Sequence, residues 1–114
     1  MAAVLPAVDG PSADLITSTP YPSVGREVIY TDSTGQFTVG IWEASAYTRK
    51  LAAFKDYELM HLIQGSMTIT NAIDESQTFN IGETFIINRG VSNAWHSTDY
   101  LRKVYCKVTP IVNA

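Results

Sequence analysis

The feature that most constrains the fold is a succession of short apolar runs separated by turn residues. Beyond Arg26, runs rich in Val, Ile, Thr, Phe and Tyr alternate with turn-rich segments such as "TDSTG", "NAIDES" and "NRG". β-Branched and aromatic residues favour strands, and Gly, Asn and Asp favour the turns between them. The pattern predicts strands at residues 28–31, 36–46, 50–54, 57–64, 66–71, 77–81, 84–87, 93–97 and 101–109.

The short connections decide how these strands pair. Parallel neighbours need a crossover of a dozen or more residues, whereas antiparallel neighbours need only a tight turn. No segment carries the periodicity of an amphipathic helix that would make such a crossover. Several runs also alternate as half-buried strands do, for example Phe37, Val39 and Ile41. We therefore expect an all-β fold, either an antiparallel sandwich or a barrel.

The length of 114 residues is typical of one domain with a single core. Residues 1–25 contain four of the five prolines together with several Ser and Thr, a composition that predicts an extended N-terminal arm. Residues 26–114 are then the single barrel domain.

Charge and cysteine content restrict the partners. Eleven acidic residues outnumber eight basic ones, and the Lys and Arg residues are scattered, which disfavours nucleic acid. Cys106 is the only cysteine, so an intrachain disulfide or a cysteine-rich zinc site is excluded. Pro6 and Asp9 interrupt the N-terminal apolar run well short of a signal peptide or membrane span. We expect a cytoplasmic protein without a membrane partner.

Two spacings carry a family resemblance. Six residues separate Glu58 from Gly65, and "GETFIINRG" places five residues between Gly82 and Asn88, with Gly90 two positions later. These spacings resemble the second half of the first cupin motif, E(X)6G, and the start of the second, G(X)5PXG. Asn88 stands where the cupin family usually has proline.

A narrower resemblance covers residues 36–109. "GIWE", Glu58, "GETFIINRG", Trp95 and "LRKVY" resemble the small single-domain cupins that are grouped with the cupin domain of (S)-ureidoglycine aminohydrolase. The resemblance implies a cupin-type jelly-roll β-barrel, also called a double-stranded β-helix, with its site in the barrel mouth. It also implies a homodimer in which the N-terminal arm packs across the partner.

The sequence departs from the cupin pattern at the metal ligands. The resemblance implies two histidines and a glutamate from the first motif and a third histidine from the second. The expected histidine positions hold Ala52 and Phe54, or Leu51 and Ala53 for the longer spacing, and Asn93. Glu58 is therefore the single ligand left, and we predict a degenerate site that holds at most a weak divalent metal and no other cofactor.

The two histidines of the chain are not expected to replace the missing metal ligands. His61 lies three residues after Glu58, and His96 lies three residues after Asn93. Successive side chains of a strand point to opposite faces, so an odd offset directs each histidine away from the expected pocket unless a β-bulge intervenes.

The remaining candidate site consists of Glu58 as hydrogen-bond acceptor or catalytic base and Asn93 as an orienting amide. The candidate wall consists of Trp42, Tyr47, Met60 and Trp95. Further candidates are the hydroxyls of Tyr57 and Tyr105 and the ammonium of Lys103, which would neutralise an acidic ligand. The alternative is structural: Glu58 is a strand-end carboxylate, the two tryptophans pack in the core or a dimer interface, and Cys106 is a small core residue.

Three functions stay open at this stage. The preferred hypothesis is binding of a small polar metabolite in the barrel mouth. The second is an isomerase, lyase or aminohydrolase-like enzyme that uses Glu58 on a small nitrogenous or carboxylated substrate. The third is a non-catalytic dimeric accessory or regulatory module whose barrel is filled by its own side chains. A fold by itself does not choose among them.

Overall fold

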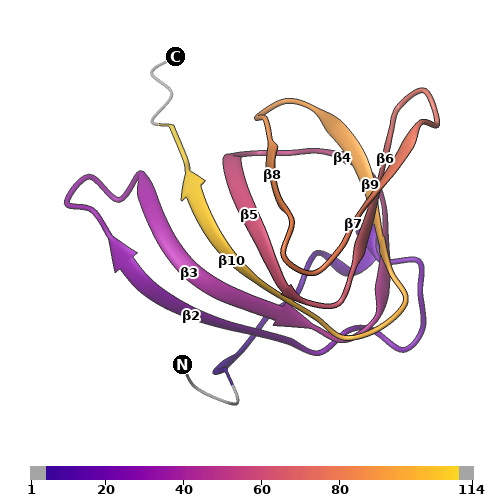
Figure 1. Ribbon diagram of the computed structural model, residues 1–114, viewed down its shortest axis with the longest axis horizontal. Coiled ribbons are helices and arrows are strands. Elements are labelled where there is room, and N and C mark those ends of the chain that lie inside the picture. Colours follow the sequence, from indigo (N-terminus) through magenta and orange to yellow (C-terminus); the bar gives the residue numbers. More distant parts are fainter. Residues whose placement is uncertain (1–4, 111–114) are drawn as a thin grey trace.

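The computed structural model describes residues 5–110, which fold into strands and one short 3-10 helix (Figure 1). The strands are β1 (Ala7–Val8), β2 (Val24–Thr31), β3 (Phe37–Ala44), β4 (Tyr47–Ala53), β5 (Tyr57–Gln64), β6 (Met67–Asn71), β7 (Ser76–Phe79), β8 (Thr84–Ile87), β9 (Ser92–Ser97) and β10 (Leu101–Val108). The 3-10 helix η1 spans Ala13–Leu15. None of the helical structure within residues 5–110 is long and apolar enough to cross a membrane.

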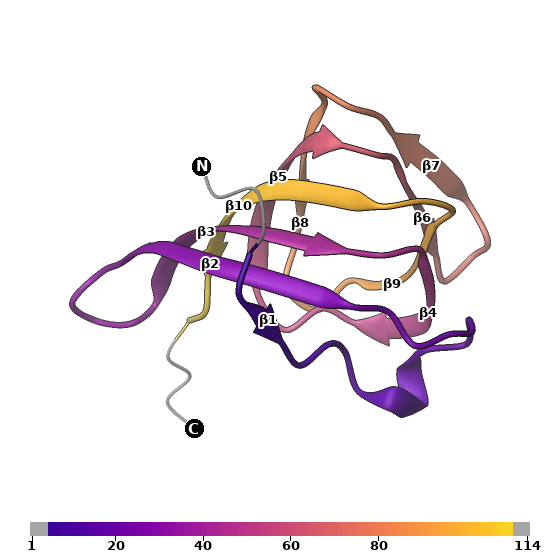
Figure 2. The same cartoon turned by 90° about the horizontal axis from the view of Figure 1, so that it is seen from below.

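Two antiparallel sheets enclose the interior. Six strands pair in the order β1-β2-β3-β10-β5-β8, and four pair in the order β4-β9-β6-β7. In Figure 1 the strands β2, β3, β10 and β5 lie to the left of the interior, and β4, β9, β6 and β7 lie to the right. Figure 2 shows β10 running between β3 and β5, two strands that are far from it in the sequence. This arrangement is a jelly-roll barrel, and the all-β prediction is confirmed.

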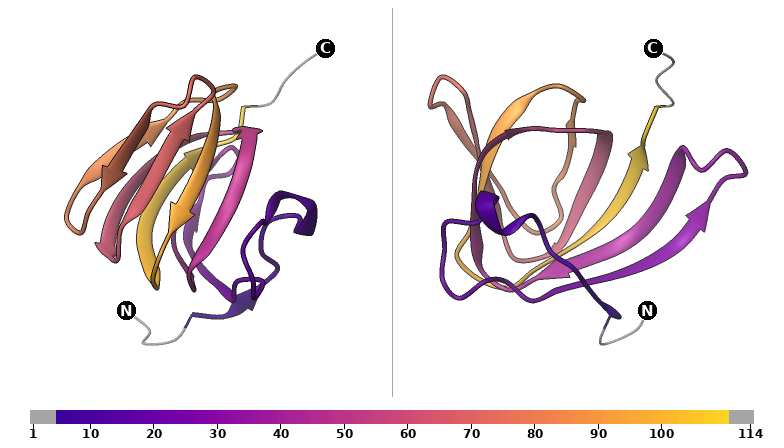
Figure 3. Two further views of the ribbon diagram at one scale, coloured as in Figure 1. Left: turned by 90° about the vertical axis from the view of Figure 1, so that its right-hand side faces the viewer. Right: turned by 180° about the vertical axis from the view of Figure 1, so that it is seen from behind.

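Each of the nine predicted strands has a counterpart, but the strand ends differ. β2 begins at Val24 and not at residue 28, because Gly25, Arg26 and Glu27 pair with β3 although none of them favours a strand by itself. Ala7 and Val8 of the predicted arm also pair with β2. The segment around η1 passes outside β4, as Figure 3 shows. Ile16, the residue after η1, forms an isolated antiparallel β-bridge with Arg49.

The core between the sheets consists of large apolar side chains. Met60, Leu62, Met67 and Leu101 are almost completely buried. Removing a side chain of this size from water contributes about 1.5–3 kcal/mol of stability. Because β5 supplies Met60 and Leu62 on the same face as Glu58, the carboxylate of Glu58 points into the same interior.

Gly65 makes the turn from β5 to β6 at φ +81°, where a side chain is disfavoured. An added Cβ would lie 2.3 Å from the backbone oxygen of Tyr100, so the turn also lacks space. Gly82 has a similar φ of +85° but has nothing within 4 Å of such a Cβ.

We predict that Gly65→Ala lowers the free energy of unfolding by about 2–4 kcal/mol, since a strained φ and a backbone clash combine. Gly82→Ala is the matched control, because it introduces the strain without the clash and is expected to cost about 1–2 kcal/mol. Urea denaturation of both variants measures the difference. Equal losses in the two variants would show that the contact with Tyr100 is unimportant.

Candidate functional site

A cavity of about 160 Å³ lies between the two sheets. Its lining residues are Pro11, Arg26, Trp42, Tyr47, Arg49, Phe54, Glu58, Trp95, Lys103, Tyr105 and Lys107. Glu58 is near the start of β5 and Lys107 is near the end of β10, so the cavity extends to this end of the barrel, which we call the barrel mouth.

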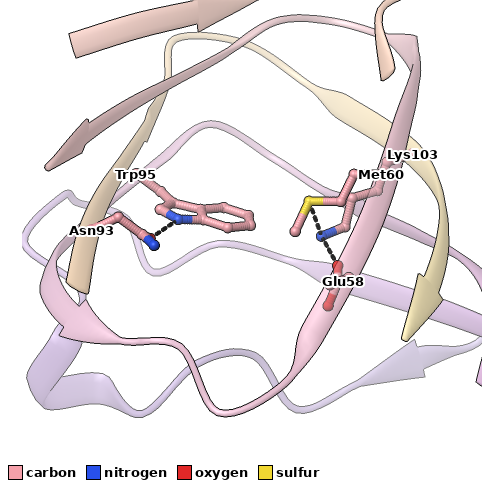
Figure 4. Close-up of polar contacts among 5 residues, drawn as sticks. All are labelled: Glu58, Met60, Asn93, Trp95 and Lys103. Atoms are coloured by element: carbon pink, nitrogen blue, oxygen red, sulfur yellow. Dashed lines mark hydrogen bonds and ion pairs between the residues drawn. The ribbon is translucent and has the colours of Figure 1, made fainter. Parts of the chain in front are cut away.

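The central contact of the site is an ion pair between Glu58 and Lys103. The Lys103 ammonium donates to Glu58 Oε2 at 2.8 Å, and the side chains of Lys103 and Glu58 are only 7% and 10% exposed. The same ammonium lies 3.4 Å from the sulfur of Met60. Figure 4 shows Glu58, Met60 and Lys103 grouped on one side of the interior, facing Trp95 on the other.

Two tryptophan rings complete the surroundings of the Lys103 ammonium. Its nitrogen lies 4.9 Å from the ring centroid of Trp42 and 5.0 Å from that of Trp95. Both distances are within the range of cation–π attraction. Trp42 belongs to the six-stranded sheet and Trp95 to the four-stranded sheet, so Lys103 contacts both walls of the barrel.

The register of β10 explains why Lys103 is in this position. Lys103 pairs with Trp42 of β3 on one side and Leu62 of β5 on the other. Side chains alternate along a strand, so Tyr105 and Lys107 share its inward face and also line the cavity.

A second polar group, on the four-stranded sheet, consists of Arg49, Asn93 and Trp95. The Arg49 guanidinium donates to Asn93 Oδ1 at 2.9 Å, and the Trp95 indole N–H donates to the same oxygen. The guanidinium also lies 5.3 Å from the Trp95 ring centroid. Burial lowers the pKa of Arg49, because none of these neighbours is an anion that would offset its desolvation.

Aromatic rings form the rest of the cavity wall. Phe54 stacks on Trp95 with 5.6 Å between ring centroids, and Trp42 meets Tyr47 edge-on at 6.1 Å. Burial raises the pKa of the Tyr47 phenol well above its usual range, so this side chain is neutral at physiological pH.

Tyr105 and Arg26, which line the cavity, each have a buried polar atom without a hydrogen-bond partner within residues 5–110. The Tyr105 hydroxyl and Arg26 Nε are buried and have no hydrogen-bond partner among the described residues. The Arg26 guanidinium lies 6.0 Å from the Tyr105 ring centroid. The Tyr105 ring fits here because Gly40 lies opposite, where an added Cβ would be 2.6 Å from the hydroxyl oxygen.

The structure brings most of the predicted site residues together. Trp42, Tyr47, Glu58 and Trp95 line the cavity, and Met60 lies beneath it against the Lys103 ammonium. Asn93 is outside the lining, where it holds Arg49 and Trp95 in position.

The other candidates lie elsewhere. Tyr57 is 43% exposed, and Cys106 is half-buried; neither residue lines the cavity. His61 contacts the hydroxyl of Thr84 at 2.8 Å, and His96 contacts that of Thr48 at 2.6 Å. Neither histidine lines the cavity.

Sequence reasoning missed Arg26, Arg49 and Lys107, and it named Phe54 only as a position without the expected histidine. Arg49 and Phe54 are separated by an odd number of positions and yet line the same cavity, because the β4–β9 register shifts between Arg49 and Ala52. The alternation of Lys103, Tyr105 and Lys107 was a visible signal of an inward face, but an inward row with two lysines contradicts the usual apolar pattern.

The donor set does not fit the metal that the cupin pattern implies. The positions where the cupin pattern expects histidine hold Ala52, Phe54 and Asn93, so they supply no imidazole. Ala52 and Asn93 are cross-strand neighbours, and Phe54 stacks on Trp95. Within residues 5–110 no group of three His, Cys, Asp or Glu side chains is arranged to hold a metal ion. The Lys103 ammonium also occupies Glu58 Oε2 and would repel a cation beside it.

A closed jelly roll with its polar site between the two sheets defines the cupin class of proteins. The model of the EutQ-like cupin domain matches residues 31–105, about two thirds of the sequence. The chain therefore belongs to the EutQ-like cupin family. No curated protein matches it.

Solved structures agree with the fold. A protein of unknown function of the DUF861 family from Pseudomonas syringae pv. tomato aligns with a TM-score of 0.88 and 29% identity over 93% of this chain. The alignment covers 45% of the Pseudomonas chain, so the present chain spans less than half of that protein.

Two EutQ structures are also similar in fold. The Clostridium difficile EutQ protein aligns with a TM-score of 0.67 and 20% identity over 80% of this chain and 71% of its own. An ethanolamine utilization protein Q from Salmonella typhimurium aligns with a TM-score of 0.65 and 16% identity over 76% of this chain and 70% of its own. At these identities the likeness concerns the fold alone.

We predict that Lys103→Met lowers the free energy of unfolding by about 3–5 kcal/mol, because it leaves the Glu58 carboxylate buried without its partner. The double variant Lys103→Met with Glu58→Gln is expected to recover part of this loss, since both charges are then removed. Lys55→Met, at an exposed position, is the control. Urea denaturation measures these three variants and the single variant Glu58→Gln, and a double variant that loses the sum of the two single losses would show that the two charges are independent.

Proposed function

We propose that the protein binds a small polar metabolite in the barrel mouth and that its metal site is degenerate. The observation that carries the proposal is the environment of Glu58. Its carboxylate faces a cavity but is bonded to the Lys103 ammonium, and the three histidine positions hold Ala52, Phe54 and Asn93. A cavity lined by both charged and aromatic side chains is the usual form of a small-molecule site.

Binding can be tested by thermal denaturation in the presence of a panel of small acids, amines and sugars. A ligand that binds the native state stabilises it, by about 2.7 kcal/mol at a hundred times its Kd. We expect at least one compound to raise Tm, and the rise to shrink in Glu58→Gln but persist in the exposed-surface control Glu75→Gln. If no member of the panel raises Tm, the proposal of a metabolite site fails.

Metal analysis of freshly purified protein tests the degenerate site. We expect Mn, Fe, Ni and Zn each to be far below one ion per chain, because a carboxylate that is bonded to an ammonium is a poor ligand. A near-stoichiometric metal that disappears in Glu58→Ala would contradict this expectation.

A second candidate function is enzymatic, with Glu58 as the catalytic base of an isomerase, lyase or aminohydrolase-like reaction. The observation in its favour is that Glu58, Lys103 and the unpartnered Tyr105 hydroxyl all line one cavity. The finer likeness to the cupin domain of (S)-ureidoglycine aminohydrolase stays a prediction, and a substrate turned over by the wild type but not by Glu58→Gln would support this alternative.

The third candidate is an accessory or regulatory module without a ligand. The 160 Å³ cavity argues against a barrel that its own side chains fill.

A cytoplasmic homodimer stays part of our proposal for any of the three functions. β2 exposes Val28, Ile29 and Tyr30, and a second chain that covered them would bury apolar surface. The molecular mass in solution would decide this point.

A further inference from the structure

We infer that the ligand of the barrel mouth is a small organic carboxylate with an apolar body no larger than one ring. The inference rests on the proposed function, because it names the class of ligand for the same cavity. Three independent features support it: the charge of the lining, the donors left without partners, and the size and chemistry of the wall.

The cavity lining is strongly cationic although the chain as a whole has a net charge of −3. Four basic side chains line the cavity, and they are Arg26, Arg49, Lys103 and Lys107. Glu58 is the one acid in the lining, and it is paired with Lys103. Three positive charges thus have no compensating acid within the lining.

Arg49 is a buried cation whose hydrogen-bond acceptors carry no charge. The residue is only 8% exposed, yet its guanidinium donates to two neutral acceptors, the amide oxygen of Asn93 and the backbone oxygen of Lys50. Within residues 5–110, no carboxylate lies within ion-pair distance of Arg26, Arg49 or Lys107. A buried guanidinium without an anion is costly to desolvate, and the attraction of a bound anion would offset part of that cost.

The unpartnered donors have the chemistry that a carboxylate needs. The Tyr105 hydroxyl is buried in a residue that is 3% exposed, and Arg26 Nε lies in the same lining. Leaving a buried donor without an acceptor costs about 1–3 kcal/mol. A carboxylate accepts at two oxygens and matches both a hydroxyl donor and the fork of a guanidinium.

The aromatic wall of the cavity restricts the size and polarity of the rest of the ligand. Trp42, Tyr47, Phe54 and Trp95 give the cavity an apolar surface, which favours an apolar body over a purely polar anion such as inorganic phosphate. The 160 Å³ volume is similar to a cavity of about 150 Å³ that accommodates benzene. Exclusion of water by these rings also strengthens the attraction between an anion and the cations.

Isothermal titration calorimetry with three probes of nearly equal shape tests the inference. Benzoate carries the negative charge, benzamide is its neutral isostere, and benzylamine is positively charged at neutral pH. We expect benzoate to bind at least tenfold more tightly than benzamide, as a hydrogen bond to a charged group adds about 1.5 kcal/mol or more. Benzylamine is expected not to bind, and added NaCl is expected to weaken benzoate binding.

Tyr105→Phe separates a binding role from a structural one. Removal of a buried hydroxyl that has no partner is expected to leave Tm unchanged or raise it, while benzoate affinity falls about tenfold. A purely structural tyrosine would not show this combination. Arg26→Gln is expected to weaken benzoate binding by a similar factor, and Arg89→Gln, an exposed arginine outside the cavity, is the matched control.

The outcomes distinguish this inference from the proposed function. Binding of benzamide or benzylamine at least as tight as that of benzoate, or benzoate affinity that is unchanged in Tyr105→Phe and Arg26→Gln, would overturn the carboxylate inference while the cavity remained a ligand site. Failure of every probe and of the whole thermal panel would overturn both. If Arg26→Gln does not fold, the probe series on the wild type and the Tyr105→Phe variant still decide the question.

Discussion

The architecture of the site depends on the buried ion pair between Glu58 and Lys103. Either charge alone would be expensive to place between two sheets, and together they satisfy each other at 2.8 Å. The pair links β5 to β10, its neighbour in the six-stranded sheet. Because the Lys103 ammonium also lies against Trp42 and Trp95, the same pair connects that sheet to the opposing one.

This pair also changes what the glutamate of the E(X)6G motif can do in the barrel. In a metal-dependent cupin the carboxylate would complete a ligand set of imidazoles, but here an ammonium of the chain itself occupies that carboxylate. The site thus has a permanent cation in place of an exchangeable one. With Arg26, Arg49 and Lys107 around it, the cavity lining is rich in positive charge, and within residues 5–110 no three His, Cys, Asp or Glu side chains are grouped to hold a metal ion.

Much of the fold and part of the site could be predicted from the chain. The strand pattern and short turns predicted an antiparallel sandwich or barrel, and the cupin resemblance implied a jelly roll. Alternation along β5 placed Glu58 and Met60 on one face with His61 on the other, as the structure has them. Arg49 could not be found in this way, because the β4–β9 register shifts between Arg49 and Ala52 and changes which positions face inward. Arg26 was also missed, since it lies among residues with weak strand preference that pair only because β3 is beside them.

The sequence by itself determined the succession of antiparallel strands and the absence of histidine at positions 52, 54 and 93, because both depend on residue types and spacings that are local along the chain. Only the tertiary structure decided which side chains meet. Lys103 and Glu58 are 45 positions apart, and Arg49 and Asn93 are 44 apart. Their contacts depend on the register of the β10–β5 and β4–β9 pairings, each of which contains a shift, and on the packing of the two sheets. No local pattern encodes these long-range pairings. The cationic character of the cavity follows from that pairing, although the chain as a whole is acidic.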